Sequence, residues 1–150
     1  MLEPACSKGD LPSATVLVVD DDAPTVRLIQ YLLESEGLAV ASAADGESAL
    51  REYARRVPDL ILLNVIMPDT DGIWLHDRLR VMGYRGPVVI VTARPDIPEL
   101  LAELRIKVAG CLVKPLHADE LLSTVRGALS GAGRAVAAKL GARNLKEEPA

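Results

Sequence analysis

The segment PDLILLNVIMPDTDG, residues 58–72, contains the pattern that decides the fold. Its run LILL is entirely apolar, which is typical of a strand buried on both faces of a parallel sheet. Asn64 follows this run, and MPDTDG then supplies the Pro, Asp and Gly residues of a turn. We therefore expect a strand at residues 60–63 and a helix at residues 73–82.

The same alternation of apolar strand and amphipathic helix extends in both directions from this segment. It predicts further strands at residues 15–19, 38–43, 87–91 and 110–113, and further helices at residues 23–36, 46–56, 98–107 and 118–129. Such alternation indicates an α/β fold with a five-stranded parallel sheet covered by five helices. Right-handed crossovers favour the flavodoxin-like, doubly wound strand order 2-1-3-4-5.

Composition excludes several classes of protein. The chain has 150 residues, of which 49% are hydrophobic and 25% charged, which suits one globular domain. A net charge of −4 argues against direct binding of nucleic acid. No apolar stretch is long enough to cross a membrane. Two cysteines, Cys6 and Cys111, are too few for a disulfide scaffold, so we expect free thiols and a cytoplasmic location.

The periodic pattern also divides the chain. We expect a flexible leader at residues 1–14, a folded domain at residues 15–129, and an Ala/Gly-rich tail at residues 130–150 that is flexible or marginally helical. About twenty residues after the domain are too few for a second one. The chain is then either a stand-alone domain or a fragment of a longer protein, and the sequence leaves both open.

Polar side chains follow the strands on either side of the expected switch point. Asp20 and Asp21 come after the first strand, Asn64 after the third, Thr92 after the fourth and Lys114 after the fifth. The carboxyl ends of parallel strands meet at one edge, so these groups should lie together. Adjacent carboxylates suit a hard cation such as Mg²⁺, and a hydroxyl and an ammonium group can donate to phosphate oxygens.

The motifs VLVVDDD, PDLILLNVIMPDTDG, VTA and LVKP together resemble the four signatures of response regulator receiver domains, over residues 15–129. The resemblance implies a receiver module of a two-component phosphorelay that acts by protein–protein interaction and is not an enzyme. It implies Mg²⁺ as cofactor, bound by Asp21, by Asp20 through water, by the side chain at position 64, and by the backbone carbonyl of Ile66.

The resemblance also implies roles for the remaining motifs. Thr92 would move toward a phosphoryl group, Lys114 would pair with that group, and Pro115 would follow a cis peptide bond. The implied partners are a sensor histidine kinase or phosphotransfer domain, and a downstream protein that meets the face made by the fourth helix, fifth strand and fifth helix. The family also allows homodimers.

Two residues depart from the family pattern. Asn64 stands where the family carries the aspartate that accepts the phosphoryl group. An amide is neutral and a poor nucleophile, so we expect phosphoryl acceptance to be lost and Mg²⁺ binding to be weakened. Cys111 stands at a switch position that is usually aromatic, and a small thiol cannot reproduce the movement of a ring. Any signal would then pass through backbone shifts.

Other interpretations remain open at this stage. Asn64 is either natural, in a receiver whose output needs no phosphorylation, or an engineered Asp-to-Asn exchange. A small aspartate-cluster phosphotransferase or phosphatase is the main alternative function, although a strand-end nucleophile is missing. A flavodoxin-type cofactor binder would need aromatic residues to cover a flavin. We expect the two histidines, His76 and His117, to be exposed polar residues rather than ligands or bases.

Overall fold

The computed structural model describes residues 14–130 of the chain. The expected leader and tail therefore lie outside the described residues, apart from Ala14 and Ser130. Cys6 also lies outside them. Within residues 14–130 there is no helix long and apolar enough to span a membrane.

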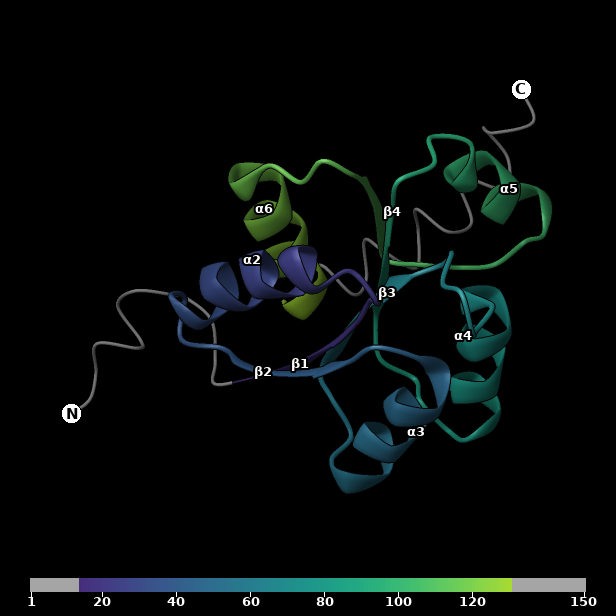
Figure 1. Cartoon of the computed structure of the whole chain (residues 1–150), viewed down its shortest axis with the longest axis horizontal. Coiled ribbons are helices and arrows are strands. Elements are labelled where there is room, and N and C mark those ends of the chain that lie inside the picture. The colour runs from purple at the N-terminus through teal and green to yellow at the C-terminus, as the bar shows by residue number, and fades with distance from the viewer. Residues whose placement is uncertain (1–13, 131–150) are drawn as a thin grey trace.

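Strands and helices alternate through the whole described part of the chain. The strands are β1 (Thr15–Val19), β2 (Ala39–Ala43), β3 (Leu60–Asn64), β4 (Val88–Thr92) and β5 (Gly110–Val113). The helices are α2 (Ala23–Glu34), α3 (Gly46–Arg55), α4 (Gly72–Val81), α5 (Ile97–Glu103) and α6 (Ala118–Leu129). All pairings are parallel and the order is β2-β1-β3-β4-β5 (Figure 1), so the predicted fold is confirmed.

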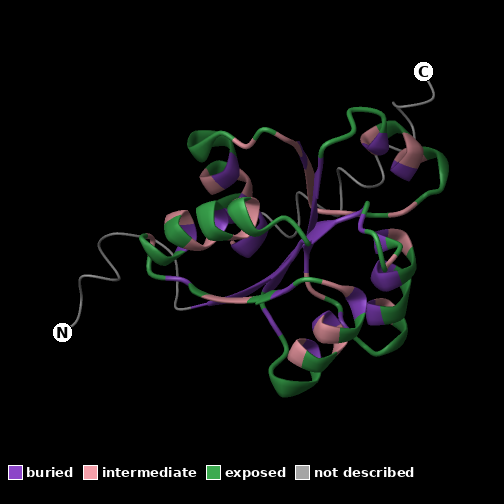
Figure 2. Ribbon diagram, in the orientation of Figure 1, coloured by how far each residue is buried: buried purple, intermediate pink, exposed green. Residues whose placement is uncertain are grey.

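The sheet separates two hydrophobic layers. Successive residues of a strand point to opposite faces, so Leu60 and Leu62 of β3 pack on one side while Ile61 and Leu63 pack on the other. Helices α2 and α6 cover the first side, and α3, α4 and α5 cover the second. The central strands are buried throughout (Figure 2), which explains why their sequences are apolar runs without alternation.

Aspartate side chains cap the first turns of α2, α3 and α4. The Asp22 carboxylate accepts a hydrogen bond from the Thr25 backbone N–H at 3.2 Å and so caps α2. Asp71 caps α4 in the same way, accepting from the Ile73 N–H at 2.9 Å. These caps fix where α2 and α4 begin, next to the loops at the carboxyl edge of the sheet.

Two local predictions were wrong. The helix expected at residues 98–107 begins at Ile97 and ends at Glu103, because Arg105 takes a left-handed backbone conformation with φ 59° that cannot continue a helix. His76 is not exposed: it is 7% exposed on the inner face of α4, between the buried residues Leu75 and Leu79. His117 is exposed, as expected.

Candidate functional site

The sheet register brings the expected site residues to one edge. Val19 pairs with Leu63, so the residues that follow, Asp20 and Asn64, are neighbours at the carboxyl ends of β1 and β3. Thr92 pairs with Val113, which places Lys114 one residue beyond the end of β5 at the same edge. The four segments thus converge at the point where the strand order reverses, which is where open α/β sheets gather their functional groups.

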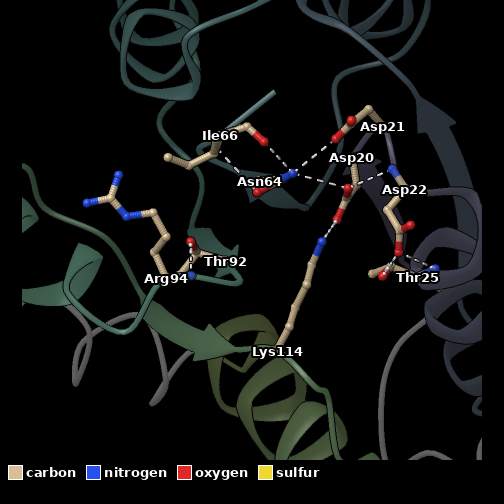
Figure 3. Close-up of polar contacts among 9 residues, drawn as sticks. All are labelled: Asp20, Asp21, Asp22, Thr25, Asn64, Ile66, Thr92, Arg94 and Lys114. Atoms are coloured by element: carbon tan, nitrogen blue, oxygen red, sulfur yellow. Dashed lines mark hydrogen bonds and ion pairs between the residues drawn. The ribbon is translucent and has the colours of Figure 1, made fainter. Parts of the chain in front are cut away.

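Asn64 lies at the centre of a polar network (Figure 3). Its side-chain nitrogen, Nδ2, donates to Asp20 Oδ1 at 3.2 Å, to Asp21 Oδ1 at 3.2 Å and to the Ile66 carbonyl oxygen at 2.9 Å. Its oxygen, Oδ1, accepts from the Ile66 N–H at 3.3 Å. An amide NH₂ has two protons, so three acceptors share them. One amide therefore joins both aspartates to the loop after β3.

Lys114 completes the network from the opposite side. Its ammonium nitrogen lies 2.9 Å from Asp20 Oδ2, and the lysine side chain is 18% exposed. Asp20 is only 3% exposed, and its other oxygen also accepts from the Asp22 N–H at 2.9 Å. A buried carboxylate is costly unless it is paired and hydrogen-bonded. Lys114 and Asn64 together meet that requirement.

The other acidic residues of the β1–α2 loop are more open to solvent. Asp21 is exposed and contacts the network through Asn64. Asp22 points away from Asn64 toward Thr25. The hydrogen bond from the Thr25 hydroxyl keeps the pKa of the Asp22 carboxyl below its ordinary value, against an opposing effect of desolvation. Asp22 is thus a helix cap rather than a member of the site.

Thr92 and Cys111 make no hydrogen bond to the Asn64 network in the described part of the chain. Thr92 is fully buried at the end of β4, and its hydroxyl oxygen accepts from the Arg94 N–H at 3.1 Å. Cys111 is half-buried in β5, on the side of the sheet covered by α3, α4 and α5. Burial raises the pKa of its thiol to about 11. The Lys114–Pro115 peptide bond is cis.

The donor set, as the side chains lie, does not fit a magnesium ion. The Asp20 and Asp21 carboxylates and the Ile66 carbonyl are suitable oxygen ligands. All three, however, already accept hydrogen bonds from Asn64 Nδ2, whose protons point into the space between them. Among residues 14–130 no group of three or more His, Cys, Asp or Glu side chains is placed to hold a metal.

Sequence reasoning located these residues but missed what Asn64 does. It treated the amide as an inert replacement with one fewer negative charge. The structure adds that the NH₂ group is a donor, which a carboxylate is not, and that it spans both aspartates. The signal was available in the chemistry of the side chain, because a buried amide beside carboxylates has protons that need acceptors.

Comparison with known proteins agrees with this geometry. The family model of the response regulator receiver domain matches residues 16–126. The transcriptional regulatory protein PrrA of Mycobacterium bovis is 36% identical over 121 residues, which are 81% of this chain and 52% of that protein. The alkaline phosphatase synthesis transcriptional regulatory protein PhoP of Bacillus subtilis is 35% identical over 114 residues, 76% of this chain and 48% of that protein.

Solved structures give the same result. The receiver domain of NtrX from Brucella abortus superposes with a TM-score of 0.70 at 29% identity, covering 76% of this chain and 97% of that one. The chain spans about half the length of the curated relatives it matches. Those relatives are named as transcriptional regulators, and that description applies to them as whole proteins.

Proposed function

Because the chain belongs to the response regulator receiver family, we propose that it is a two-component receiver module whose pocket no longer accepts a phosphoryl group. Asn64 is assigned to the phosphoacceptor position, at the end of β3. An amide oxygen is a poor nucleophile compared with a carboxylate, so an acyl phosphate should not form there. The output of the module would then not depend on phosphorylation at this position.

The network around Asn64 supports this proposal more than any other observation. Its amide nitrogen donates to Asp20, Asp21 and the Ile66 carbonyl, the oxygens expected to hold Mg²⁺ in the family. A cation would have to displace these hydrogen bonds and would meet one negative charge fewer. We therefore expect Mg²⁺ to bind more weakly than it does to the Asn64→Asp variant.

We also assign the remaining roles by position. Thr92 and Lys114 are the groups that would contact a phosphoryl group, and Cys111 occupies the switch position. Since Cys111 carries no ring, coupling between the pocket and the surface would run through the backbones of β4, α5 and β5. The downstream partner would bind the face formed by α5, β5 and α6, and a histidine kinase or phosphotransfer domain would meet the pocket edge. Homodimerisation is the alternative use of that face.

A test of phosphoryl acceptance separates this function from its alternative. The chain and its Asn64→Asp variant are incubated with acetyl phosphate and Mg²⁺, and their intact masses are measured. We expect the added mass of one phosphoryl group on the variant and none on the chain itself. A phosphoryl adduct on the unsubstituted chain, or turnover of acetyl phosphate by it, would support the phosphotransferase or phosphatase reading instead.

The proposal also covers where the module acts and whether it contacts nucleic acid. A cytoplasmic location fits the low cysteine content of the chain. The net charge of −4 argues against nucleic-acid contact by the receiver module itself. For any longer protein that contains this module, the PrrA and PhoP relatives make transcriptional regulation the function to test first.

A further inference from the structure

A hollow lined by several charged residues lies at the amino ends of the strands, opposite to the edge that carries Asn64. It has a volume of about 640 Å³ and lies between α4 and the segment that follows α5. Arg85 lies just before β4, and residues 104–107 lie just before β5, so the hollow is at the amino ends of these strands. The polar network around Asn64 is at the carboxyl ends of the strands. The two sites are therefore distinct, and the inference below does not depend on the proposed function.

Four of the residues that line this hollow carry a positive charge and only one is acidic. They are Arg80, Arg85, Arg105 and Lys107, with Asp77 as the acid. Within residues 14–130 none of the four forms an ion pair with a carboxylate. A concentration of unpaired cations is unexpected in a chain with a net charge of −4. It creates a local positive potential that attracts anions.

Backbone contacts hold two of these guanidinium groups in place. Arg80 Nη1 donates to the carbonyl oxygens of Tyr84 at 2.9 Å and Gly86 at 2.8 Å, and its guanidinium lies 5.4 Å from the centre of the Tyr84 ring. Arg85 Nη1 donates to the Arg80 carbonyl oxygen at 2.9 Å. Each guanidinium has five N–H donors, so both keep donors for a ligand after these bonds.

A buried histidine in the wall gives an independent indication of a ligand. His76 is 7% exposed, and neither of its ring nitrogens makes a hydrogen bond of normal geometry within the described part of the chain. The Asp77 carboxylate oxygen Oδ1 is 3.6 Å from Nδ1, beyond hydrogen-bond distance. Buried polar atoms without partners are uncommon in folded proteins, and they often mark a position that a ligand or water fills.

The surroundings of this imidazole favour its neutral form. Burial lowers the pKa of His76, and the Arg80 charge lowers it further, while Asp77 and the Lys107 backbone carbonyl act in the opposite direction. A neutral imidazole has one N–H donor. The hollow therefore offers fixed guanidinium groups, two further cations on its rim, and a buried donor.

We propose that this hollow binds a phosphate group. Guanidinium groups match the oxygens of phosphate through paired hydrogen bonds, and a buried N–H donor adds a directional contact. The described residues that line the hollow include no Trp, Tyr or Phe, so stacking of a nucleobase is not expected. The aliphatic side chains Ile73, Leu104 and Ile106 complete the wall. The phosphate could be free in solution or carried on a phosphorylated side chain of a partner.

The test uses NMR of the chain with two probes, inorganic phosphate and N-acetyl phosphoserine amide, at constant ionic strength in chloride. We expect saturable shifts of the His76 ring signals and of the backbone amides of residues 104–107, with no change in the His117 ring. Tighter binding of inorganic phosphate would identify a free anion as the ligand, and tighter binding of phosphoserine a phosphorylated segment. Absence of saturable shifts with both probes would overturn the proposal.

Variants inside and outside the hollow distinguish a specific phosphate site from general attraction of anions to positive charge. Arg105→Gly combined with Lys107→Gln should weaken binding by about tenfold or more, as expected for loss of two charge-assisted contacts. Glycine suits the left-handed backbone at position 105, so this variant should fold, and thermal unfolding checks that it does. Arg78→Gln removes a charge from the exposed side of α4, outside the hollow, and should leave affinity unchanged. Equal weakening by Arg78→Gln would refute a specific site.

Discussion

Replacing Asn64 by aspartate should destabilise the protein when no divalent cation is present. The substitution is nearly isosteric, so packing around β3 should change little. It removes, however, the NH₂ group that donates to Asp20, Asp21 and the Ile66 carbonyl. It puts in that place a carboxylate that faces two others. The network would change from mutually attractive to mutually repulsive contacts.

The distances in the network set the size of this effect. At an effective dielectric constant of about 20, two unit charges 3.2 Å apart repel by ~5 kcal/mol. Lys114 offsets part of the repulsion at Asp20, and the introduced carboxyl group can take up a proton. If like charges raise its pKa by about two units, the free energy of unfolding at neutral pH falls by ~3 kcal/mol. We therefore expect a loss of about 2–4 kcal/mol.

The sign of the pH dependence follows from the raised pKa. The folded state of Asn64→Asp should bind more protons than its unfolded state between about pH 4, the usual carboxyl pKa, and its own higher value. The loss of unfolding free energy relative to the unsubstituted chain is then fully present above the raised pKa, and it disappears as the pH falls toward 4. Urea unfolding followed by circular dichroism, repeated across this range in EDTA, measures it.

Added Mg²⁺ provides the second half of this experiment. A cation bound at a site with three carboxylates, one of them acting through water, should restore about 2.7 kcal/mol to Asn64→Asp at a hundredfold excess over Kd, and much less to the unsubstituted chain at the same concentration. Gln30→Glu, an amide-to-acid change on α2 away from the pocket, is the control and should respond to neither EDTA nor Mg²⁺. Equal stability of the chain and Asn64→Asp in EDTA would refute the role given to the amide.

Three further predictions concern other parts of the fold. Gly72→Ala should lower the free energy of unfolding by more than about 2 kcal/mol, since the added Cβ would lie 2.5 Å from the Val65 Cα. Gly127→Ala has open space around the added Cβ and should be neutral or stabilising. Urea titrations of both variants measure the difference. Cys111, with its thiol pKa raised to about 11, should react with iodoacetamide at pH 8 far more slowly in the native protein than in urea, as peptide mass mapping would record. His76 should titrate below pH 6.5 by NMR, and because its unfolded state binds more protons there, stability should fall as the pH drops below 6.5.

The course of the backbone could be predicted from the sequence because the central strands have a clear sequence signature. Runs such as LILL at the centre of the sheet are apolar at every position, which is required of a strand covered on both faces. Their regular alternation with amphipathic helices leaves few topologies. The side chains at the strand ends could be placed at one edge for the same reason, without any knowledge of their contacts.

The features that escaped prediction depend on contacts between distant segments. His76 is polar and so was expected to be exposed, yet it lies on the same inner stripe of α4 as Leu75 and Leu79. The end of α5 depends on the left-handed backbone of Arg105, a residue that gives no sequence signal for it. The cationic hollow joins residues from α4 and from the segments before β4 and β5. No local pattern reveals such a cluster.

Under the proposed function, the two departures from the family pattern would affect the same process at different steps. Asn64 acts at the proposed acceptor position, where its amide donates hydrogen bonds to both carboxylates of the acidic pair while the Lys114 ammonium pairs with Asp20. Cys111 acts at the proposed switch position, where a half-buried thiol replaces a ring. The Thr92 hydroxyl oxygen is meanwhile engaged by the Arg94 N–H, so its movement toward the pocket would cost that bond. Restoring the acceptor alone should therefore return phosphorylation of the pocket without restoring a full response on the α5–β5–α6 face.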